Sequence, residues 1–337
     1  MKNTKDFEIK TQIALQKLED YRIEVVGTIE RMKQLIPMPI GLFFITLITY
    51  FAGAHNQIVL PIILIILMAI GIFYWGLIIH EDKLLERYRN EIVAMYVEHF
   101  YPQINYFPDN YTYKHLLTGC TFWGSHNPYK AENFFMGKTS HDYHFLFFET
   151  TQLLTSNQQN PRDLFWSVHH PTIHYKQIVL LPKQQNLPSF VDDTVKAFKR
   201  RAVQLTHFSA PNQAFNRYFD VFSAEEDEVL HLLTDDFCQA IMELQKQHQL
   251  PMAISLVRYK LYCWIYNQNK YFEINSNQPI EEQQIDKKLH GELSNCFDTL
   301  NRLSSLLNQQ KPFERITPKD DNANNSAYDH FFDSDNP

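Results

Sequence analysis

Two long apolar stretches dominate the first quarter of the chain. They run from 35 to 54 and from 58 to 79, and neither contains Asp, Glu, Lys, Arg or His. About 20 apolar residues suffice for a helix to cross the ~30 Å hydrocarbon core of a bilayer. Because neither stretch has a polar face, we predict a transmembrane helical hairpin over 35–79 rather than two core helices of a soluble protein.

Amphipathic patterns flank the hairpin and predict a helix over 1–34 and another over 80–102. Because the two spans are antiparallel, these helices emerge on the same side, where their apolar stripes could pack into a stalk of ~30 Å. The alternative is that the stripes lie in the headgroup region. The stripes consist of Leu18, Tyr21, Val25 and Met32 before the first span and of Leu85, Tyr88, Ile92, Met95 and His99 after the second.

Basic residues predict the orientation of the hairpin. They precede the first span and follow the second, whereas the connection at 55–57 carries none, which favours both termini in the cytoplasm. The polar residues before the first span and the lack of a cleavage pattern predict a retained hairpin rather than a signal peptide. We expect a multi-pass protein of the inner (plasma) membrane. The basic residues are Lys17, Arg22, Arg31, Lys33, Lys83, Arg87 and Arg89.

A folded cytoplasmic domain is predicted over 103–312. Its clearest strand is 142–151, which is apolar or aromatic at almost every position and therefore covered on both faces. About five strands in a mixed or antiparallel sheet are expected. The further predicted strands are 178–181, which Pro182 closes, 215–222, and 256–266 paired with 271–274 across a turn at 267–270.

Helices punctuate the strands without a strict βαβ rhythm, so the predicted fold class of the domain is α+β. Ser189 and Ser223 open two of the helices in capping-box form. The acidic, Asn-rich composition of 313–337 is typical of a disordered tail. The predicted helices are 189–201, 223–233, 235–247 and 280–307.

Composition excludes several classes of partner and cofactor. The net charge is -7, with 31 basic and 38 acidic residues, so no basic excess is present to neutralise nucleic acid. The four cysteines are far apart and form no CxxC pair, which fits a reducing compartment. Neither a GxGxxG nor a GxxxxGK[ST] loop occurs, and we expect no cofactor.

The densest group of potential metal ligands is His169, His170 and His174. Neutral imidazole is a common zinc ligand. However, Pro171 prevents a helical i,i+4 spacing of His170 and His174, and neither Cys nor a carboxylate completes a ligand pattern. We therefore predict surface or packing histidines and no metal.

A basic run, Lys196, Lys199, Arg200 and Arg201, ends the helix predicted over 189–201, where positive charge complements the helix dipole. Its alternative role is contact with anionic lipid or with an acidic partner, because the domain would be tethered beside the negative inner leaflet.

Two other groups have both a structural and a chemical interpretation. The acidic run 225–228 opens a predicted helix, where negative charge is favourable without any chemistry. Cys120 could be a nucleophile assisted by His126, but lone cysteines are usually small buried hydrophobes. A pocket joining Glu228, Glu273 or histidines with Cys120 would favour an enzyme.

Besides the spans, three stretches carry a pattern: ENFFMGKT at 132–139, FNRYFDVFSAEEDEVLHLLTDDF at 215–237 and LYCWIYNQNKYFEI at 261–274. Together they resemble a bacterial two-pass membrane protein family catalogued as domain of unknown function 3137. Leu230 departs from the family, in which arginine is usual there, and Asp235 replaces a proline. The resemblance implies architecture and membrane location, and it brings no established activity or catalytic residues.

These observations favour a non-catalytic, membrane-tethered cytoplasmic module that binds or scaffolds another protein or a second copy of itself. Its expected partners are the lipid bilayer and a protein, and not nucleic acid. The alternative is a membrane-bound enzyme with a site assembled from scattered residues. A third interpretation, an oligomeric pore, is disfavoured because the spans contain no ionisable residue.

Overall fold

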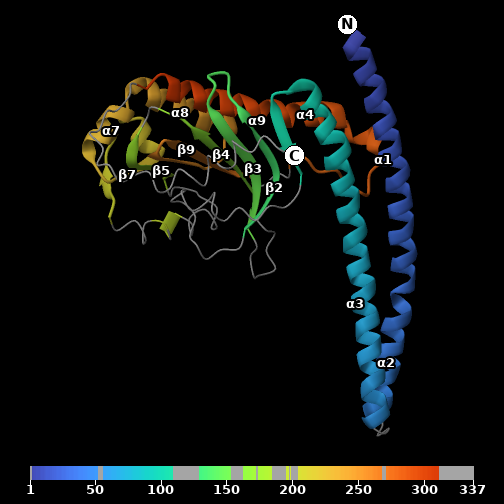
Figure 1. The fold of residues 1–337 in the computed structure, drawn as a ribbon. Coiled ribbons are helices and arrows are strands. Elements are labelled where there is room, and N and C mark those ends of the chain that lie inside the picture. Colours follow the sequence, from blue (N-terminus) through green and yellow to red (C-terminus); the bar gives the residue numbers. More distant parts are fainter. Residues whose placement is uncertain are drawn as a thin grey trace.

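The computed structural model describes residues 2–51, 56–108, 129–152, 162–171, 174–183, 195–196, 198, 204–267 and 271–310. Within these ranges, a long helical hairpin stands beside a sheet that carries two helices on one face (Figure 1). The predicted tail lies outside the described residues, as does most of the helix predicted over 189–201.

The hairpin exposes apolar side chains over much of its length. Two helical runs, Lys5–Phe51 and Pro61–Phe100, are long and apolar enough to cross a membrane, and 6% of each apolar window is buried. Ile48 and Trp75 are each 67% exposed. Such a surface suits hydrocarbon better than water. The elements are α1 Lys2–Leu35, α2 Pro37–Phe51, α3 Asn56–Arg87, the π-helix η1 Tyr88–Val93 and α4 Ala94–Phe100.

Helix α1 packs antiparallel to α3 and its continuation, as the predicted stalk requires. The Phe7 ring stacks on His99 at 3.9 Å between centroids, and the Arg87 guanidinium lies 4.8 Å from the centroid of the Tyr21 ring. Leu18 is fully buried. The two stripes therefore contact each other along the part of the stalk that holds the domain.

These contacts fix the register of the stalk. A Cβ atom added at Gly76 would lie 2.5 Å from the terminal methyl of Met32. We expect cysteines introduced together at positions 32 and 76 to form a disulfide under mild oxidation, detected by gel mobility. Val25 and Ile92 form the control pair, because the register separates them by about 10 residues, or ~15 Å along the axis. A cross-link in the control pair alone would contradict this packing.

The sheet is antiparallel throughout, which is one of the two predicted arrangements. Its described strands lie in the order β1-β2-β3-β4-β9-β8-β5-β7-β6. The β8–β9 hairpin is thus inserted between β4 and β5. The strands are β1 Ile104–Phe107, β2 Tyr129–Lys138, β3 His144–Gln152, β4 Arg162–His169, β5 Tyr175–Pro182, β6 Thr206–Phe208, β7 Phe219–Ser223, β8 Met252–Arg258 and β9 Lys260–Asn267.

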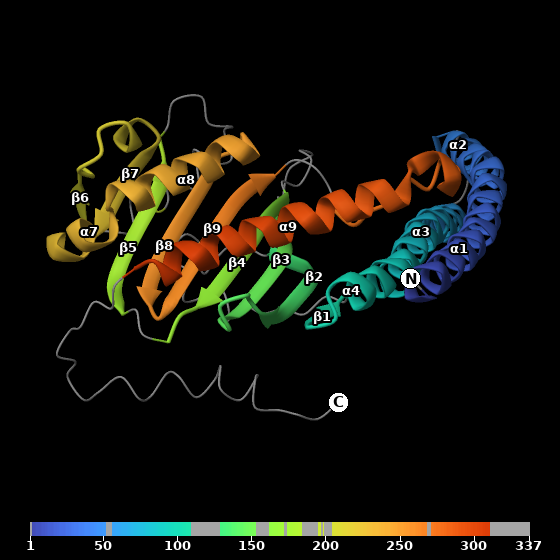
Figure 2. The ribbon, with the colours of Figure 1, turned by 90° about the horizontal axis from the view of Figure 1, so that it is seen from above.

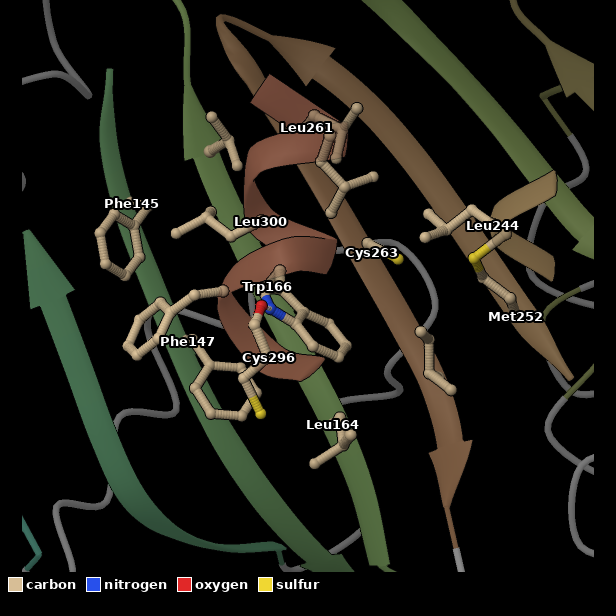
Figure 3. Close-up of a cluster of buried hydrophobic side chains, with 14 of the residues drawn as sticks. Phe145, Phe147, Leu164, Trp166, Leu244, Met252, Leu261, Cys263, Cys296 and Leu300 are labelled. Atoms are coloured by element: carbon tan, nitrogen blue, oxygen red, sulfur yellow. Dashed lines mark hydrogen bonds between the residues drawn. The ribbon is translucent and has the colours of Figure 1, made fainter. Parts of the chain in front are cut away.

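Helices α8 and α9 cover one face of the sheet, and α9 runs across it from the stalk (Figure 2). Trp166 on β4 is fully buried beneath α9, packs on Phe147 and donates from Nε1 to the Cys296 carbonyl at 3.2 Å (Figure 3). A second apolar cluster, including Phe148 and Trp264, lies on the opposite face. The remaining elements are η2 Phe215–Arg217, α7 Glu226–Leu232, α8 Asp235–His248, η3 Ile280–Gln283 and α9 Ile285–Asn308.

The pairing predicted between 256–266 and 271–274 is wrong. The first stretch spans most of the β8–β9 hairpin, in which Val257 pairs with Lys260. Arg258 and Tyr259 form a two-residue loop, and Arg258 has φ 55°, as the favoured hairpin turns require. Residues 271–274 form no strand and cross toward the stalk instead. The turn was missed because it carries no Gly or Asn.

Two other predicted elements begin later than expected. Residues 215–217 form a short 3-10 helix rather than strand, since the Asn212 carboxamide accepts the Phe215 N–H at 3.1 Å and starts the turn. Helix α7 begins at Glu226 and has no capping box. Ser223 instead ends β7, and its hydroxyl donates to the Gln177 and Glu225 carbonyls at 3.0 Å.

Candidate functional site: the junction between hairpin and sheet

The π-helix η1 turns two consecutive side chains, Tyr88 and Arg89, toward the domain. Both are buried, as are Ile92 and Val93 one turn later. π turns inside helices are often found at functional sites. The helix that continues from the second apolar stretch brings a buried cation to the edge of the sheet.

Arg89 meets carboxylates from two separate segments. Its Nη2 atom lies 3.4 Å from Glu132 Oε2 on β2 and 3.8 Å from Glu273 Oε1, and its Nε donates to the Phe272 carbonyl at 3.5 Å. The Arg89 and Glu132 side chains are only 8% and 7% exposed. Removing one partner of such a buried pair is costly, because the other charge stays desolvated.

A bulge in β2 supplies the next contacts. The β2–β3 register shifts between Glu132 and Phe135, and Asn133 adopts φ 53°. The Asn133 side chain donates to Glu149 Oε2 at 2.5 Å and accepts the Tyr106 hydroxyl at 2.8 Å. Bulges re-aim side chains in this way. Here the bulge holds Glu149, a carboxylate buried within an apolar strand.

Segment 271–274 and α9 close the site. The Tyr271 N–H donates to Glu149 Oε1 at 3.0 Å, and the Phe272 N–H donates to Glu292 Oε2 at 2.9 Å. Six residues from five segments are thus linked by these contacts. Two of the four carboxylates, those of Glu132 and Glu273, lie within 4 Å of the buried guanidinium. Lys130 and Lys288 form ion pairs at the rim. We call this set the junction cluster: Arg89, Glu132, Asn133, Glu149, Glu273 and Glu292.

Glu292 makes the junction cluster sensitive to pH. Burial raises the pKa of its carboxyl to about 7; Glu273 adds to this rise, while the Phe272 N–H and Lys288 oppose it. The fold therefore holds the Glu292 proton more tightly than the unfolded chain does. It follows that stability falls as pH rises from about 4.5 through about 7.

We expect Glu292→Gln to flatten this dependence and to raise the free energy of unfolding above pH 7 by about 2–3 kcal/mol relative to wild type. Glutamine keeps the acceptor for the Phe272 N–H. Urea unfolding of the full chain in mild detergent, followed from pH 5 to 8, measures the effect. Glu243→Gln, at an exposed position on α8, is the control; parallel curves for wild type and Glu292→Gln would refute the assignment.

A second contact ties α1 to the domain. Arg22 pairs with Glu19 at 2.7 Å and donates to the Ser276 carbonyl at 3.2 Å, while Glu19 accepts the Ile280 N–H at 3.0 Å. A groove of about 620 Å³ lies beside it, between α1 and the start of α9. A shallower groove of about 460 Å³ is lined by Glu292.

The predicted histidine site does not assemble into a ligand set. His169 ends β4, His170 is buried with its ring 4.3 Å from Tyr143, and His174 packs edge-on to Tyr259 at 5.0 Å. Burial lowers the pKa of His170, which favours the neutral ring. Across the described ranges, no group of three or more His, Cys, Asp or Glu is arranged to hold a metal ion.

Glu228 has a structural role at the opposite end of the sheet. The β5–β8 register shifts between Tyr175 and Ile178, and the Glu228 carboxylate accepts the Lys176 N–H at 2.7 Å and the Gln177 N–H at 3.5 Å. It thereby completes a bulge that the neighbouring strand leaves open. Burial raises its pKa, and the two N–H groups counteract that rise.

Of the residues that might have formed an enzyme site, the two described carboxylates lie apart. Glu228 lies by β5, whereas Glu273 lies at the stalk beyond β3 and β4 (Figure 1). Cys120 is outside the described residues, as are Lys199, Arg200 and Arg201 of the basic run. Lys196 is described and exposed.

The sequence interpretation missed the junction cluster itself. In the sequence, Arg89 contributes only to the charge pattern that predicts topology, and Glu149 is a single charge within an apolar strand. A lone carboxylate in a strand covered on both faces requires a buried partner, and that was the available signal. Its partners could not all be named, because Tyr271, whose N–H donates to Glu149, lies 122 residues further along the chain.

Comparison with known proteins supports the family resemblance. Residues 164–305 match the family described as protein of unknown function (DUF3137). These residues form a DUF3137 domain. Within the fold, the DUF3137 domain runs from β4 to α9 and includes Trp166, Glu228 and Glu292. Two of the three resembling stretches, 215–237 and 261–274, lie inside it.

No curated protein matches the chain. One solved structure, the mycobacterial trehalose monomycolate transport factor A (TtfA), is similar at 10% identity. The match covers 68% of this chain and 98% of that one, with a TM-score of 0.34. A score of this size establishes neither a shared fold nor a shared role, and the DUF3137 description assigns no function.

Proposed function

We propose that this protein is a non-catalytic module that is anchored in the inner membrane by its hairpin and holds a partner protein, or a second copy of itself, at the cytoplasmic face. The observation that carries the proposal is the continuity of α3, η1 and α4. One helix begins in an exposed apolar span and ends within the core of the domain, where Tyr88 and Ile92 are fully buried. A domain mounted in this way keeps a defined orientation to its anchor.

Charged residues near the spans support the cytoplasmic orientation. Lys17, Arg31, Lys33 and Lys83 are exposed on the stalk, on the side of the spans away from the 55–57 connection. Lys and Arg near the ends of spans favour the cytoplasmic side. Arg89, by contrast, is bound inside the junction cluster and contributes to the fold.

The described thiols, which could act as nucleophiles, are buried in the fold, and this supports a binding role. The described cysteines, Cys238, Cys263 and Cys296, are free and buried. Burial raises the pKa of the Cys238 thiol to about 12 and also raises those of the other two thiols. Such thiols stay protonated at neutral pH and make poor nucleophiles.

The test is proximity labelling in cells by the full chain fused to a labelling enzyme at its N-terminus. The control carries the same fusion and hairpin with an unrelated soluble domain in place of 103–312. We expect at least one protein, or the chain itself, to be enriched by the full chain and not by the control. Turnover of a small molecule by the purified chain, without any such enrichment, would contradict the proposal and favour an enzyme.

A further inference from the structure

Helix α1 exposes apolar side chains on the part of the stalk that precedes the first apolar stretch. Among the described residues outside the two stretches, four large apolar side chains are more than half exposed, and three of them belong to α1. These three are Ile9, Ile13 and Ile23, at 55%, 53% and 57%, and the fourth is Leu230. Single exposed apolar side chains are ordinary on a protein surface, whereas several on one helix indicate a contact surface.

The three isoleucines recur with the spacing of a coiled coil. Positions 9, 13, 16, 20, 23 and 27 follow one another at alternating steps of four and three residues, which places them on one side of the helix. Gln16 Nε2 donates to Asp20 Oδ1 at 3.1 Å, and the second N–H of a carboxamide can reach a neighbouring helix. Polar residues within such a spacing fix the register of two helices. We call this set the α1 stripe: Ile9, Ile13, Gln16, Asp20, Ile23 and Gly27.

The α1 stripe faces away from the rest of the described chain. Helix α1 packs on α3 with its opposite side, where Leu18 and Val25 are buried, and it lies on the far side of the stalk from the sheet (Figure 1; Figure 2). Lipid does not reach the upper isoleucines if the hairpin spans the bilayer. Ile13 precedes Leu35, where the uncharged stretch begins, by 22 residues, or ~33 Å along the helix, and the headgroup layer is only roughly 5–8 Å thick.

Gly27 leaves the backbone open on the same side of α1. A Cβ atom added at Gly27 would meet no atom within 4 Å, so no contact inside the chain requires glycine there. Glycine weakens a helix interior relative to alanine, and its usual benefit is the close approach of another backbone. The position therefore suits a contact with a second helix.

The two flanks of the α1 stripe differ in charge. Lys17 is exposed on one flank, about 80° round the helix from Ile9. The other flank is the groove of about 620 Å³ between α1 and the start of α9, which three carboxylates and one lysine line. Glu281 and Asp286 are the exposed carboxylates of this groove. When two such helices pack in parallel through the α1 stripe, the Lys17 flank of each faces the acidic groove of the other.

We infer that two copies of this chain pair through their α1 stripes, side by side and parallel. The inference deepens the proposed function and rests on it, because anchoring by the hairpin gives every copy the same direction in the membrane. A two-fold axis along the membrane normal brings each residue of the stripe against its counterpart at the same height. Confinement to the bilayer lowers the cost of orienting two copies, so that a narrow stripe suffices.

The test is disulfide cross-linking of the full chain, with Cys120→Ser, in proteoliposomes. Ile13→Cys and Ile23→Cys place a thiol on the α1 stripe, whereas Lys10→Cys places one at an exposed position about 100° from Ile9. Under mild oxidation, we expect a product of twice the mass on a non-reducing gel for both stripe positions. Its yield should be about five-fold or more above that of Lys10→Cys, whose two thiols lie too far apart for a disulfide.

Gly27→Leu, added to Ile13→Cys, should lower the yield about ten-fold, because the leucine side chains hold the two backbones apart. Gly71→Leu is the matched control, since a Cβ atom at Gly71 on α3 also meets no atom within 4 Å. It should leave the yield unchanged. Equal yields at positions 10, 13 and 23, or equal effects of the two leucines, would overturn the pairing.

Flotation of the proteoliposomes separates failure of the pairing from failure of the proposed function. Protein that does not float with lipid contradicts the anchor, and with it both proposals. Floating protein with equal yields at the three cysteine positions contradicts the pairing alone. Enrichment of another protein in the labelling experiment would then uphold the proposed function without a second copy.

Discussion

Arg89→Ala is expected to destabilise the domain by about 3–5 kcal/mol, because it leaves buried carboxylates without their cation. Glu132 and Glu273 approach the guanidinium within 4 Å, and the Phe272 carbonyl loses its donor as well. Urea unfolding of the full chain in mild detergent, followed by fluorescence of the buried tryptophans, measures the loss.

Arg87→Ala is the matched control on the preceding residue. The Arg87 ion pair with Glu91 is 37% and 40% exposed, so its loss should cost under about 1 kcal/mol even with its contact to Tyr21. Adding Glu132→Gln to Arg89→Ala should recover part of the stability, since it removes a buried charge that has lost its guanidinium partner and keeps only the ion pair with Lys130 at the rim. Equal costs for the two arginines, with no recovery, would contradict the electrostatic account of the junction cluster.

Trp166→Ala is expected to cost about 3–5 kcal/mol, because it empties the space between β4 and α9. Trp166 is fully buried, packs on Phe147 at 5.0 Å between ring centroids and is the only hydrogen-bonding indole found beneath α9 in the described structure. The lost donor to the Cys296 carbonyl adds to the cavity. Thermal unfolding of the domain by circular dichroism in mild detergent measures the effect.

Trp75→Ala supplies the comparison on an exposed tryptophan. Trp75 lies on the hairpin and is 67% exposed, so its removal should leave domain unfolding within about 0.5 kcal/mol of wild type. A similar loss of unfolding free energy in Trp75→Ala and Trp166→Ala would contradict the account in which α9 covers the apolar core around Trp166.

The elements that the sequence predicts correctly are those in which a run of apolar residues is not interrupted by charge. The hairpin follows from two long uncharged stretches, and β3 and β5 follow from unbroken apolar runs. Strands β2 and β4 were missed because charged residues interrupt them. Glu132 on β2 and Asp163 on β4 are nevertheless buried. The charged residues that interrupt the apolar pattern of these two strands therefore lie in the interior of the domain.

The candidate site could be predicted only in part. Tyr88 falls on the apolar stripe of an amphipathic helix, but the spacing of that stripe does not reveal that the neighbouring Arg89 is buried as well. The register of β2 depends on a bulge at Asn133 that carries no glycine. Contacts between residues over a hundred positions apart arise from tertiary packing, which a single sequence does not specify.

The junction cluster also suggests why the anchor and the domain would be coupled. Its members come from the stalk, from two strands of the sheet and from α9, so the stalk cannot shift without breaking buried polar contacts. A partly neutral Glu292 near pH 7 makes this coupling respond to local acidity.

The central claim, that the hairpin spans the membrane with the domain in the cytoplasm, is tested most directly by thiol labelling of spheroplasts. Single cysteines at position 57, between the spans, and at position 246, on α8, are compared in a Cys120→Ser chain. A membrane-impermeant reagent should label position 57 in intact spheroplasts and position 246 only after permeabilisation. Labelling of both positions before permeabilisation, or of position 246 alone, would contradict the account.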